Sequence, residues 1–236
     1  MKYIILAAGK GTRLHPITLD TPKSLFMLDE NTSVIQRLVN LLKKFNPSAE
    51  IIVVTGFMHE HLHKHVAGVN FIYNPFFEFT NSIASLWFAR NSLLESSGVA
   101  IMNADIVLEE LLVELILSKT PTKPSVLIDT TVKHNGDYNV KTNCNKVVVM
   151  SKELTSFDGQ YAGVALLDKD TIKPFVAEID RMVCSGRYNE WFEDALVQMI
   201  FKHNLNLYFQ DISEYQWAEI DSVDDLLNAK LIHNHN

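Results

Sequence analysis

The sequence has few cysteines, no excess of positive charge and no long hydrophobic run. Its 236 residues include only two cysteines, Cys144 and Cys184; they give no sign of a disulfide framework or a zinc site and indicate a reducing compartment, the cytoplasm. The formal net charge of −7 argues against non-specific nucleic-acid binding, which requires a basic surface. No stretch approaches the roughly 20 apolar residues of a membrane span, so we expect no membrane partner.

The apolar run at the N-terminus is short as well. It covers about six residues, 3–8, and then meets Gly9, whereas a secretory signal has about 7–15 apolar residues and a cleavage site. We therefore interpret it as a first buried strand. Hydrophobic residues make up 47% of the chain, which is typical of a globular protein with a substantial core.

Short apolar runs alternate with helical patterns along the first half of the chain. The pattern predicts strands at 3–8, 50–55, 70–73, 99–103 and 125–129, and helices at 33–45, 59–66, 82–94 and 108–118. This alternation predicts an α/β fold with a mostly parallel sheet and helices on both faces. After residue 130 we expect shorter strands at 141–151, 161–167 and 205–211, and helices at 189–202 and 222–231.

A glycine-rich turn follows the first predicted strand. Gly9 and Gly11 let backbone N–H groups approach a polyphosphate without interference from a Cβ atom. Arg13 and Lys23 supply a guanidinium fork and a point charge for phosphate oxygens. The turn is neither a Walker A loop nor a GxGxxG motif, because Leu14 stands at the position of the third glycine.

The whole opening string, LAAGKGTRL followed by Pro16 and Pro22-Lys23, resembles the signature of the sugar-nucleotide pyrophosphorylase superfamily. These enzymes join a nucleoside triphosphate to a phosphorylated acceptor. The resemblance implies a Rossmann-like three-layer nucleotidyltransferase fold with a mostly parallel mixed sheet. The sequence shows no linker, repeat or low-complexity tract, so we expect one domain over 1–236, in which 1–130 bind the nucleotide and 131–236 bind the acceptor and complete the metal site.

Two aspartates stand where strands are expected to end. Asp105 follows the strand at 99–103, and Asp221 precedes the helix that Ser222 and Asp225 cap in the manner of a capping box. Magnesium prefers oxygen ligands and neutralises the charge that spreads over a transferring phosphoryl group. Both positions match the superfamily pattern, which implies that Asp105 and Asp221 bind Mg²⁺; the alternative for Asp105 is a helix cap.

The short chain and several segments resemble the phosphocholine cytidylyltransferase-like branch of the superfamily. The matching segments are NSIASL at 81–86, VK at 140–141, MSK at 150–152, GQYAG at 159–163 and WFEDAL at 191–196. The branch uses CTP and accepts phosphocholine, phosphoethanolamine, 2-aminoethylphosphonate or phosphorylated L-glutamine. The chain is also similar to the CTP:phosphoglutamine cytidylyltransferases of capsular phosphoramidate synthesis, so the expected partners are CTP and a small phosphorylated amine or amino acid.

The resemblance implies three groups of site residues. The residues expected to neutralise the charge of the phosphates, together with Mg²⁺, are Arg13, Lys23, Asp105 and Asp221. The nucleotide-binding group is Leu6, Ala8, Gly9, Gly11, Thr12, Arg13, Lys23, Asn81 and Ser85. The acceptor-binding group is Lys141, Lys152, Tyr161, Gly163, Trp191, Glu193 and Asp194. The acceptor phosphate is already anionic at pH 7, so the expected in-line attack on the α-phosphorus requires no catalytic base.

Several alternatives stay open at this stage. The aromatic and acidic residues at 188–194 can bind a quaternary ammonium, bind the ammonium of an amino acid, or simply pack a helix. Lys141 and Lys152 can be solvated surface charges. The chain as a whole can be a uridylyl- or thymidylyltransferase for a sugar 1-phosphate, or a nucleotide-binding module without catalysis.

Four histidines, His59, His61, His63 and His65, show the i, i+4 spacing of zinc ligands but are more typical of a solvated helix. The oligomeric state is not determined by the sequence.

Overall fold

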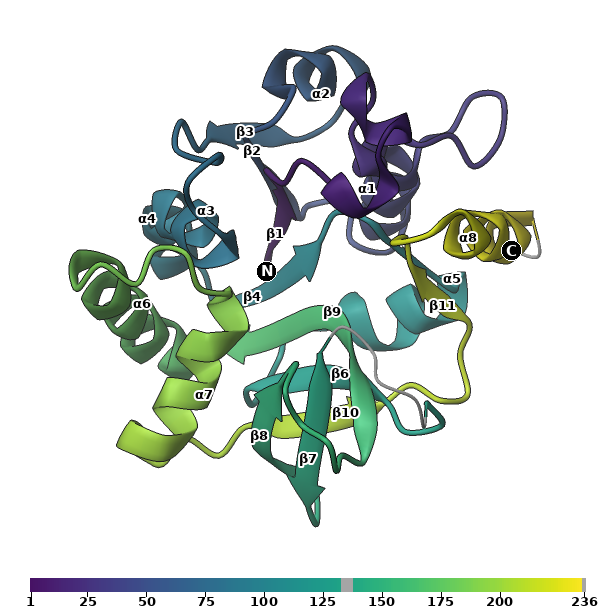
Figure 1. The fold of residues 1–236 in the computed structure, drawn as a ribbon. Helices are drawn as coiled ribbons and strands as arrows, with labels where there is room; N and C mark the ends of the chain where they lie inside the picture. The colour runs from purple at the N-terminus through teal and green to yellow at the C-terminus, as the bar shows by residue number, and fades with distance from the viewer. Residues whose placement is uncertain (133–137, 235–236) are drawn as a thin grey trace.

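The computed structural model describes residues 1–132 and 138–234 and shows a nine-stranded mixed sheet with helices on both faces (Figure 1). In sheet order the strands are β3 (Asn70–Tyr73), β2 (Glu50–Thr55), β1 (Lys2–Ala7), β4 (Gly98–Asn103), β9 (Gly159–Asp168), β6 (Ser125–Asp129), β10 (Tyr208–Asp211), β8 (Lys146–Ser151) and β7 (Asn139–Asn143). Two further strands, β5 (Ile106–Leu108) and β11 (Trp217–Glu219), pair with each other. The expected α/β fold with a mixed sheet is confirmed.

The helices cover both faces of this sheet. They are α1 (Val34–Phe45), α2 (His59–His65), α3 (Ser82–Phe88), α4 (Arg90–Leu94), α5 (Glu110–Leu112), α6 (Lys169–Cys184), α7 (Phe192–His203) and α8 (Val223–Asn234). Short 3₁₀ turns η1 (Thr12–Leu14), η2 (Ile17–Leu19) and η3 (Lys23–Leu25) follow β1, and a π-helical turn η4 (Val113–Leu117) continues α5. Within the described residues, none of the helices has the length and apolarity that a bilayer crossing requires.

The alternation of side chains along the central strands builds two cores. In β1, Ile4 joins the core that contains α3, α4, α6 and α7, whereas Tyr3 and Ile5 join the core that contains α1, α2 and α5. Successive residues of a strand point to opposite faces of the sheet, so a strand buried on both sides is apolar throughout. This explains why β1 reads in the sequence as a continuous apolar run.

Strand direction divides the sheet into two regions. β1 is parallel to β2 and β4, and β2 is parallel to β3. β9 is antiparallel to β4, β6 and β7, while β10 is parallel to β6. The carboxyl ends of β1, β2 and β4 therefore lie at one edge of the sheet, which is where parallel α/β sheets bind ligands.

The first half of the chain follows the sequence pattern closely, with two exceptions. Strands β2, β3 and β6 have the predicted bounds. The predicted helix 82–94 is wrong as one helix, because Ala89 leaves the helical conformation (φ −88°, ψ 0°) and separates α3 from α4. The predicted helix 108–118 is wrong at its start, since Leu108 ends strand β5 and the helical part begins at Glu110.

The second half departs further from the pattern. The predicted strand 141–151 is a hairpin of β7 and β8, which reverses next to Cys144 (φ 55°). Helix α7 begins at Phe192 rather than at residue 189. Helix α6 was not predicted; it carries Pro174 in its sixth position, a residue that normally ends or kinks a helix. The division into a nucleotide half and an acceptor half stays a prediction.

Candidate active site

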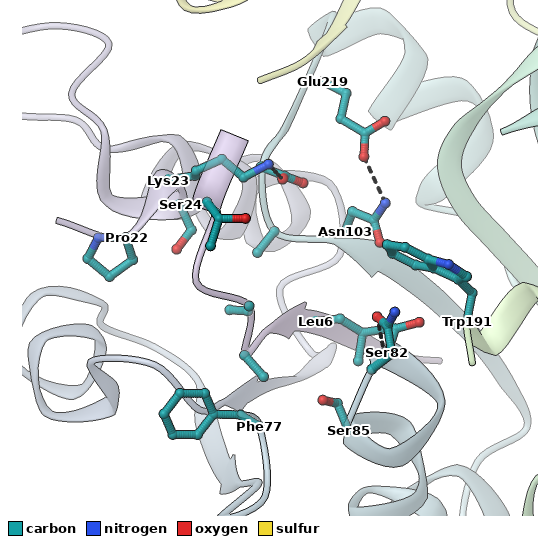
Figure 2. A pocket seen from close by; sticks show the side chains of 18 of the residues that line it. Leu6, Pro22, Lys23, Ser24, Phe77, Ser82, Ser85, Asn103, Trp191 and Glu219 are labelled. Atoms are coloured by element: carbon teal, nitrogen blue, oxygen red, sulfur yellow. Dashed lines mark hydrogen bonds and ion pairs between the residues drawn. The ribbon is translucent and has the colours of Figure 1, made fainter. Parts of the chain in front are cut away.

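A cavity of about 300 Å³ opens at the edge of the sheet where β1 and β4 end (Figure 2). Its lining comes from the turn after β1, the segment that carries Lys23, the N-terminus of α3, the end of β4 and the segments before α7 and α8. The lining residues are Leu6, Ala7, Ala8, Gly9, Gly11, Thr12, Arg13, Pro22, Lys23, Ser24, Phe77, Thr80, Asn81, Ser82, Ser85, Asn103, Ala104, Asp105, Trp191 and Glu219. All nine predicted nucleotide-binding residues are among them.

The two glycines of the turn have different structural roles. At Gly11 the backbone is left-handed (φ 63°), and a Cβ atom there would lie 2.8 Å from Cγ of Lys23. At Gly9 a Cβ atom would meet nothing within 4 Å, so that position faces open space. The hydroxyl of buried Thr18 donates to the carbonyl of Gly11 at 2.8 Å and holds the turn. Gly11 thus lets Lys23 pack against the turn, and Gly9 leaves room for a ligand.

Lys23 brings the two predicted metal-binding carboxylates together. Its Nζ atom lies 2.6 Å from Oδ2 of Asp105 and 2.7 Å from Oδ1 of Asp221. The guanidinium of Arg13 lies 3.0 Å from the other oxygen of Asp221. The side chains of Lys23, Asp105 and Asp221 are only 14–19% exposed, so water screens these charges weakly. The structure thus gathers all four residues predicted to neutralise charge.

Two strands that the sequence did not reveal place the aspartates side by side. Asp105 precedes β5 and Asp221 follows β11, and these strands pair in antiparallel fashion with Ile106 opposite Glu219. The amide of Ile220 donates to the carbonyl of Asp105 at 3.0 Å. Asp105 therefore enters a strand and does not begin a helix. Residues 116 positions apart become neighbours through this pairing.

The predicted capping box at the start of α8 is confirmed. The Asp225 carboxylate accepts hydrogen bonds from the amides of Asp221 and Ser222, and the amide of Asp225 donates to the Ser222 hydroxyl at 3.2 Å. Such a box satisfies N–H groups that have no partner within the helix. It also fixes the backbone of Asp221, whose side chain is thereby directed to Lys23.

The charge of Lys23 is stabilised by its two partners. Burial disfavours the ammonium, but Asp105 and Asp221 outweigh this effect and hold the pKa of Lys23 above its usual value. The two carboxylates converge on a single cation and offer hard oxygen ligands. This donor set fits Mg²⁺, which binds one or two carboxylates and completes its shell with phosphate and water oxygens. In the part of the chain that the structure describes, no group of three or more acidic, histidine or cysteine side chains forms a metal site.

A buried amide organises the wall beside α3. Asn74 is fully buried, and its side-chain nitrogen lies 3.1 Å from the hydroxyl of Thr80 and 3.0 Å from that of Ser85. The Asn74 side-chain oxygen accepts from the amide of Phe76. Thr80 and Ser85 both line the cavity. The network therefore fixes the loop between β3 and α3 against the predicted nucleotide-binding residues.

The predicted acceptor residues lie mostly around the start of α7. Trp191 lines the cavity, and Nζ of Lys152 lies 4.1 Å from the centre of its ring, within range of a cation–π contact. The Asp194 carboxylate accepts from the amide of Trp191 at 2.9 Å and from the hydroxyl of Tyr138 at 2.8 Å. Asp194 therefore caps α7 and orients Tyr138 within the same cluster.

Glu193 and Tyr161 form a buried polar pair. Oε2 of Glu193 and the hydroxyl of Tyr161 are both buried without a hydrogen-bond partner. Burial raises the pKa of Glu193 to about 8, with a further contribution from Asp194. Burial and the neighbouring Glu193 also raise the pKa of Tyr161 well above its usual value. At pH 7 Glu193 is therefore mostly a neutral carboxylic acid.

Of the seven predicted acceptor residues, Trp191 alone belongs to the lining of the cavity, and Lys141 and Gly163 also lie away from the cluster at the start of α7. Nζ of Lys141 lies 2.9 Å from a carboxylate oxygen of Asp158, so its charge is paired there. Gly163 has a left-handed backbone (φ 71°), and a Cβ atom there would lie 3.2 Å from the side-chain nitrogen of Asn103. Gly163 thus lets β9 approach the end of β4, and the roles of both residues in acceptor binding stay predictions.

Sequence reasoning missed two polar residues between the aspartates and the acceptor cluster. The side-chain nitrogen of Asn103 donates to Oε1 of Glu219 at 2.9 Å, and both line the cavity (Figure 2). The signals were available, because Asn103 ends a predicted strand and Glu219 stands two residues before Asp221. Phe77 and Thr80, by contrast, lie in a loop with no motif.

The histidines of α2 pack against aromatic residues. The His63 ring stacks on Phe71 at 3.9 Å between centroids, and the His59 ring lies 4.6 Å from that of Tyr73. His59 and His63 contact each other edge to face. His59 and His63 thus lie against β3, whereas His61 and His65 are exposed and contact each other.

The sequence matches the family model described as the MobA-like NTP transferase domain over residues 3–181. The choline-phosphate cytidylyltransferase of Streptococcus pneumoniae is 29% identical over 95% of both chains. The 2-aminoethylphosphonate cytidylyltransferase of Lancefieldella rimae is 26% identical, over 94% of this chain and 89% of the relative. The CTP:phosphoglutamine cytidylyltransferase of Campylobacter jejuni is 23% identical, over 96% and 98%. These matches confirm the predicted resemblance to a nucleotidyltransferase branch.

The fold also matches a solved structure along its whole length. A structure of the CTP:phosphocholine cytidylyltransferase from Streptococcus pneumoniae superposes with a TM-score of 0.78, covers 98% of both chains and shares 24% sequence identity. At this level of identity the match shows the fold.

The buried Glu193 predicts a pH-dependent loss of stability. Its pKa is about 8 in the folded protein against an ordinary value of 4.5, so the folded state binds the proton more tightly. Its contribution to the free energy of unfolding is therefore complete below pH 4.5 and is lost as the pH rises through 8. Relative to Glu193→Gln, the wild-type protein should lose on the order of a few kcal/mol between pH 5 and pH 9.

Urea unfolding at pH 5, 7 and 9 measures this difference. Glu153→Gln serves as the matched control, because Glu153 is exposed and should show no such trend. Parallel pH profiles for wild type and Glu193→Gln would contradict the assignment of a neutral, buried Glu193.

Proposed function

The chain belongs to the MobA-like NTP transferase domain family, and on that basis we propose that it transfers CMP from CTP to a small phosphorylated amine or amino acid and releases pyrophosphate. The observation that carries the proposal is the convergence of Lys23, Asp105, Asp221 and Arg13 beside the glycine turn. This arrangement supplies cations for a triphosphate and carboxylates for a divalent metal at one edge of the sheet.

Two features of the cavity suit a nucleoside triphosphate. The turn at Gly9 and Gly11 presents backbone N–H groups next to Arg13 and Lys23, which suits the triphosphate. Ser85 and Asn81 at the N-terminus of α3 provide polar groups for the base and ribose. The choice of CTP is proposed from the names of the three relatives above, whose acceptors differ but which are all cytidylyltransferases.

Asp105 and Asp221 are the residues that would hold Mg²⁺. When bound, the metal supplies a positive charge that stabilises the developing charge on the phosphates. Lys23 has three N–H donors, of which two bind the carboxylates, so one remains for a phosphate oxygen. Arg13 contacts Asp221, is half exposed and lines the cavity, so its guanidinium lies where a triphosphate would bind.

The acceptor is proposed to enter beside Trp191. Lys152 lies over the indole ring and can turn its ammonium to the acceptor phosphate. Glu193, Tyr161 and Asp194 adjoin Trp191 without lining the cavity, and they are the polar groups proposed to shape the site for the amine or amino acid end. A pyrophosphate-release assay with different acceptors tests whether that end carries a quaternary ammonium, a primary ammonium or a carboxylate.

The residues of the site promote the reaction by positioning and charge neutralisation. The acceptor phosphate is already ionised, so no side chain needs to remove a proton from it. Its oxygen forms a bond to the α-phosphorus as the bond to the bridging oxygen of pyrophosphate breaks. Lys23 and Arg13 then stabilise the charge that accumulates on the departing pyrophosphate. We propose that this reaction takes place in the cytoplasm, as the cysteine content suggests, and that it serves the synthesis of cell-surface polysaccharides, as the resemblance to CTP:phosphoglutamine cytidylyltransferases implies.

A pyrophosphate-release assay tests the proposed function. CTP, UTP, TTP, ATP and GTP are each combined with Mg²⁺ and with phosphocholine, phosphoethanolamine, 2-aminoethylphosphonate, phosphorylated L-glutamine or glucose 1-phosphate. We expect turnover with CTP and one of the first four acceptors. Turnover with UTP or TTP and glucose 1-phosphate would contradict the proposal, and no release from any pair would indicate a non-catalytic nucleotide-binding module.

Removal of the Lys23 ammonium should impair the chemical step. Lys23→Ala should lower kcat/KM by on the order of 10²–10³, because it removes one preorganised charge from the transition state. Steady-state kinetics with CTP and the accepted substrate provide the measurement. Lys64→Ala, on the exposed surface of α2, is the matched control and should retain wild-type rates. An unchanged kcat/KM for Lys23→Ala would remove Lys23 from the mechanism.

The carboxylate pair predicts a specific change in the magnesium requirement. Asp221→Asn should bind Mg²⁺ more weakly and lose most of its turnover, while its circular dichroism and thermal unfolding remain close to wild type. Asp224→Asn, a neighbouring acid that does not contact Lys23, is the control. A fully active Asp221→Asn protein at limiting Mg²⁺ would refute the two-carboxylate model.

A further inference from the structure

Three hydrogen bonds join the start of α3 to the segment before α7, and a fourth caps α3 itself. The amide of Asn81 donates to the carbonyl of Tyr188 at 3.1 Å, and the amide of Ile83 donates to the carbonyl of Glu190 at 3.3 Å. The amide of Phe192 donates to the Ser82 hydroxyl at 2.9 Å, and the amide of Ser82 is capped by its neighbour Asn81 at 2.8 Å. We refer to residues 81–83 and 188–192 together as the α3–α7 seam.

The seam satisfies the N-termini of two helices at once. The first N–H groups of any helix have no partner within the helix. In α3 the amide of Ile83 donates to a backbone carbonyl of the 188–192 segment, and the amide of Ser82 donates to the Asn81 side chain. In α7 the first amide, that of Phe192, donates to Ser82. Ser82 therefore supplies the only side-chain hydrogen bond that crosses the described part of the seam. Without its hydroxyl, the Phe192 amide would lose its partner.

The α3 side and the α7 side of the seam line two parts of one cavity that are predicted to bind different ligands. Asn81, Ser82 and Ser85 line it from α3, on the side predicted to bind the nucleotide. Trp191 lines it from the start of α7, on the side predicted to bind the acceptor. Figure 2 shows Ser82 and Trp191 beside each other at the same end of the cavity.

Trp191 is held on both sides along its backbone. Its own amide is capped by Asp194 at 2.9 Å, while the residues before and after it, Glu190 and Phe192, bond to α3. Any displacement of the α3 N-terminus is thus passed directly to the backbone on which the indole stands. Contact between two such elements is a physical route for coupling between ligands.

We propose that Ser82 is a positioning residue that couples the nucleotide side of the cavity to Trp191 on its acceptor side. The proposal rests on the proposed function for the identity of the two ligands, but the seam itself does not. Ser82 acts through the Phe192 amide and sets the place of Trp191. Loss of its hydroxyl should therefore affect the acceptor more than the nucleotide.

Kinetics and fluorescence together test this role. Ser82→Ala is compared with Ser82→Thr, which keeps an accepting hydroxyl, and with Ser92→Ala on α4, where no side-chain hydrogen bond is made by the hydroxyl. The KM values for CTP and for the phosphorylated acceptor accepted in the screen are measured for each protein. Acrylamide quenching is measured with and without CTP and Mg²⁺, and each protein is also made with Trp191→Phe, so that the difference isolates Trp191 from Trp87 and Trp217.

The expected result separates the two sides of the cavity. Ser82→Ala should raise the acceptor KM about 2- to 10-fold, as the loss of one hydrogen bond does, with the KM for CTP changed less than 2-fold. Trp191 should be quenched more strongly in the free variant and should no longer respond to CTP. Ser82→Thr should restore both properties, and Ser92→Ala should match wild type.

Three other outcomes have defined meanings. Wild-type quenching of Trp191 and an unchanged acceptor KM in Ser82→Ala would overturn the proposal. Equal increases in both KM values would also overturn it, since Ser82 would then be a general contact. If no nucleotide and acceptor pair is turned over by the wild type, the proposed function fails, and quenching of Trp191 in the free proteins alone decides the inference: increased quenching in Ser82→Ala supports it, and unchanged quenching overturns it.

Discussion

The ammonium of Lys23 lies between the carboxylates of Asp105 and Asp221, and the geometry of the site depends on that contact. Both carboxylates lie within 2.7 Å of the same ammonium, so they would repel each other if that cation did not lie between them. The glycine turn also makes room for Lys23, because any side chain at Gly11 would collide with the aliphatic part of the Lys23 side chain. One charged contact thus links the start of the chain, its middle and its end.

The remaining wall of the cavity is built on hydrogen bonds rather than on charge. The Asn74 network fixes the loop before α3, and the α3–α7 seam fixes Trp191. The two systems meet at the N-terminus of α3, where Ser82 and Ser85 both face the cavity. A charged corner and a hydrogen-bonded wall therefore share one cavity of about 300 Å³.

Part of this structure could be read from the sequence for a simple reason. Strands β2, β3 and β6 are short, buried and bounded by polar or turn-forming residues, so their apolar runs show them directly. The hairpin of β7 and β8 was less visible, because its reversal at Cys144 carries neither glycine nor proline. Helix α6 was hidden by Pro174. Strands β5 and β11 have only three residues each, too few to show any period.

The sequence by itself determined which residues form the glycine turn and its two cations, because the glycines, Arg13 and Lys23 lie within 15 residues of one another. It also identified the family and named both aspartates. Only the tertiary structure decided that these aspartates meet, since their contact depends on the pairing of β5 with β11 across 116 positions. The tertiary structure likewise decided that Lys141 pairs with Asp158, that Glu193 is buried and neutral, and that Ser82 bonds to the start of α7. Those properties arise from packing between distant segments, which local sequence patterns do not encode.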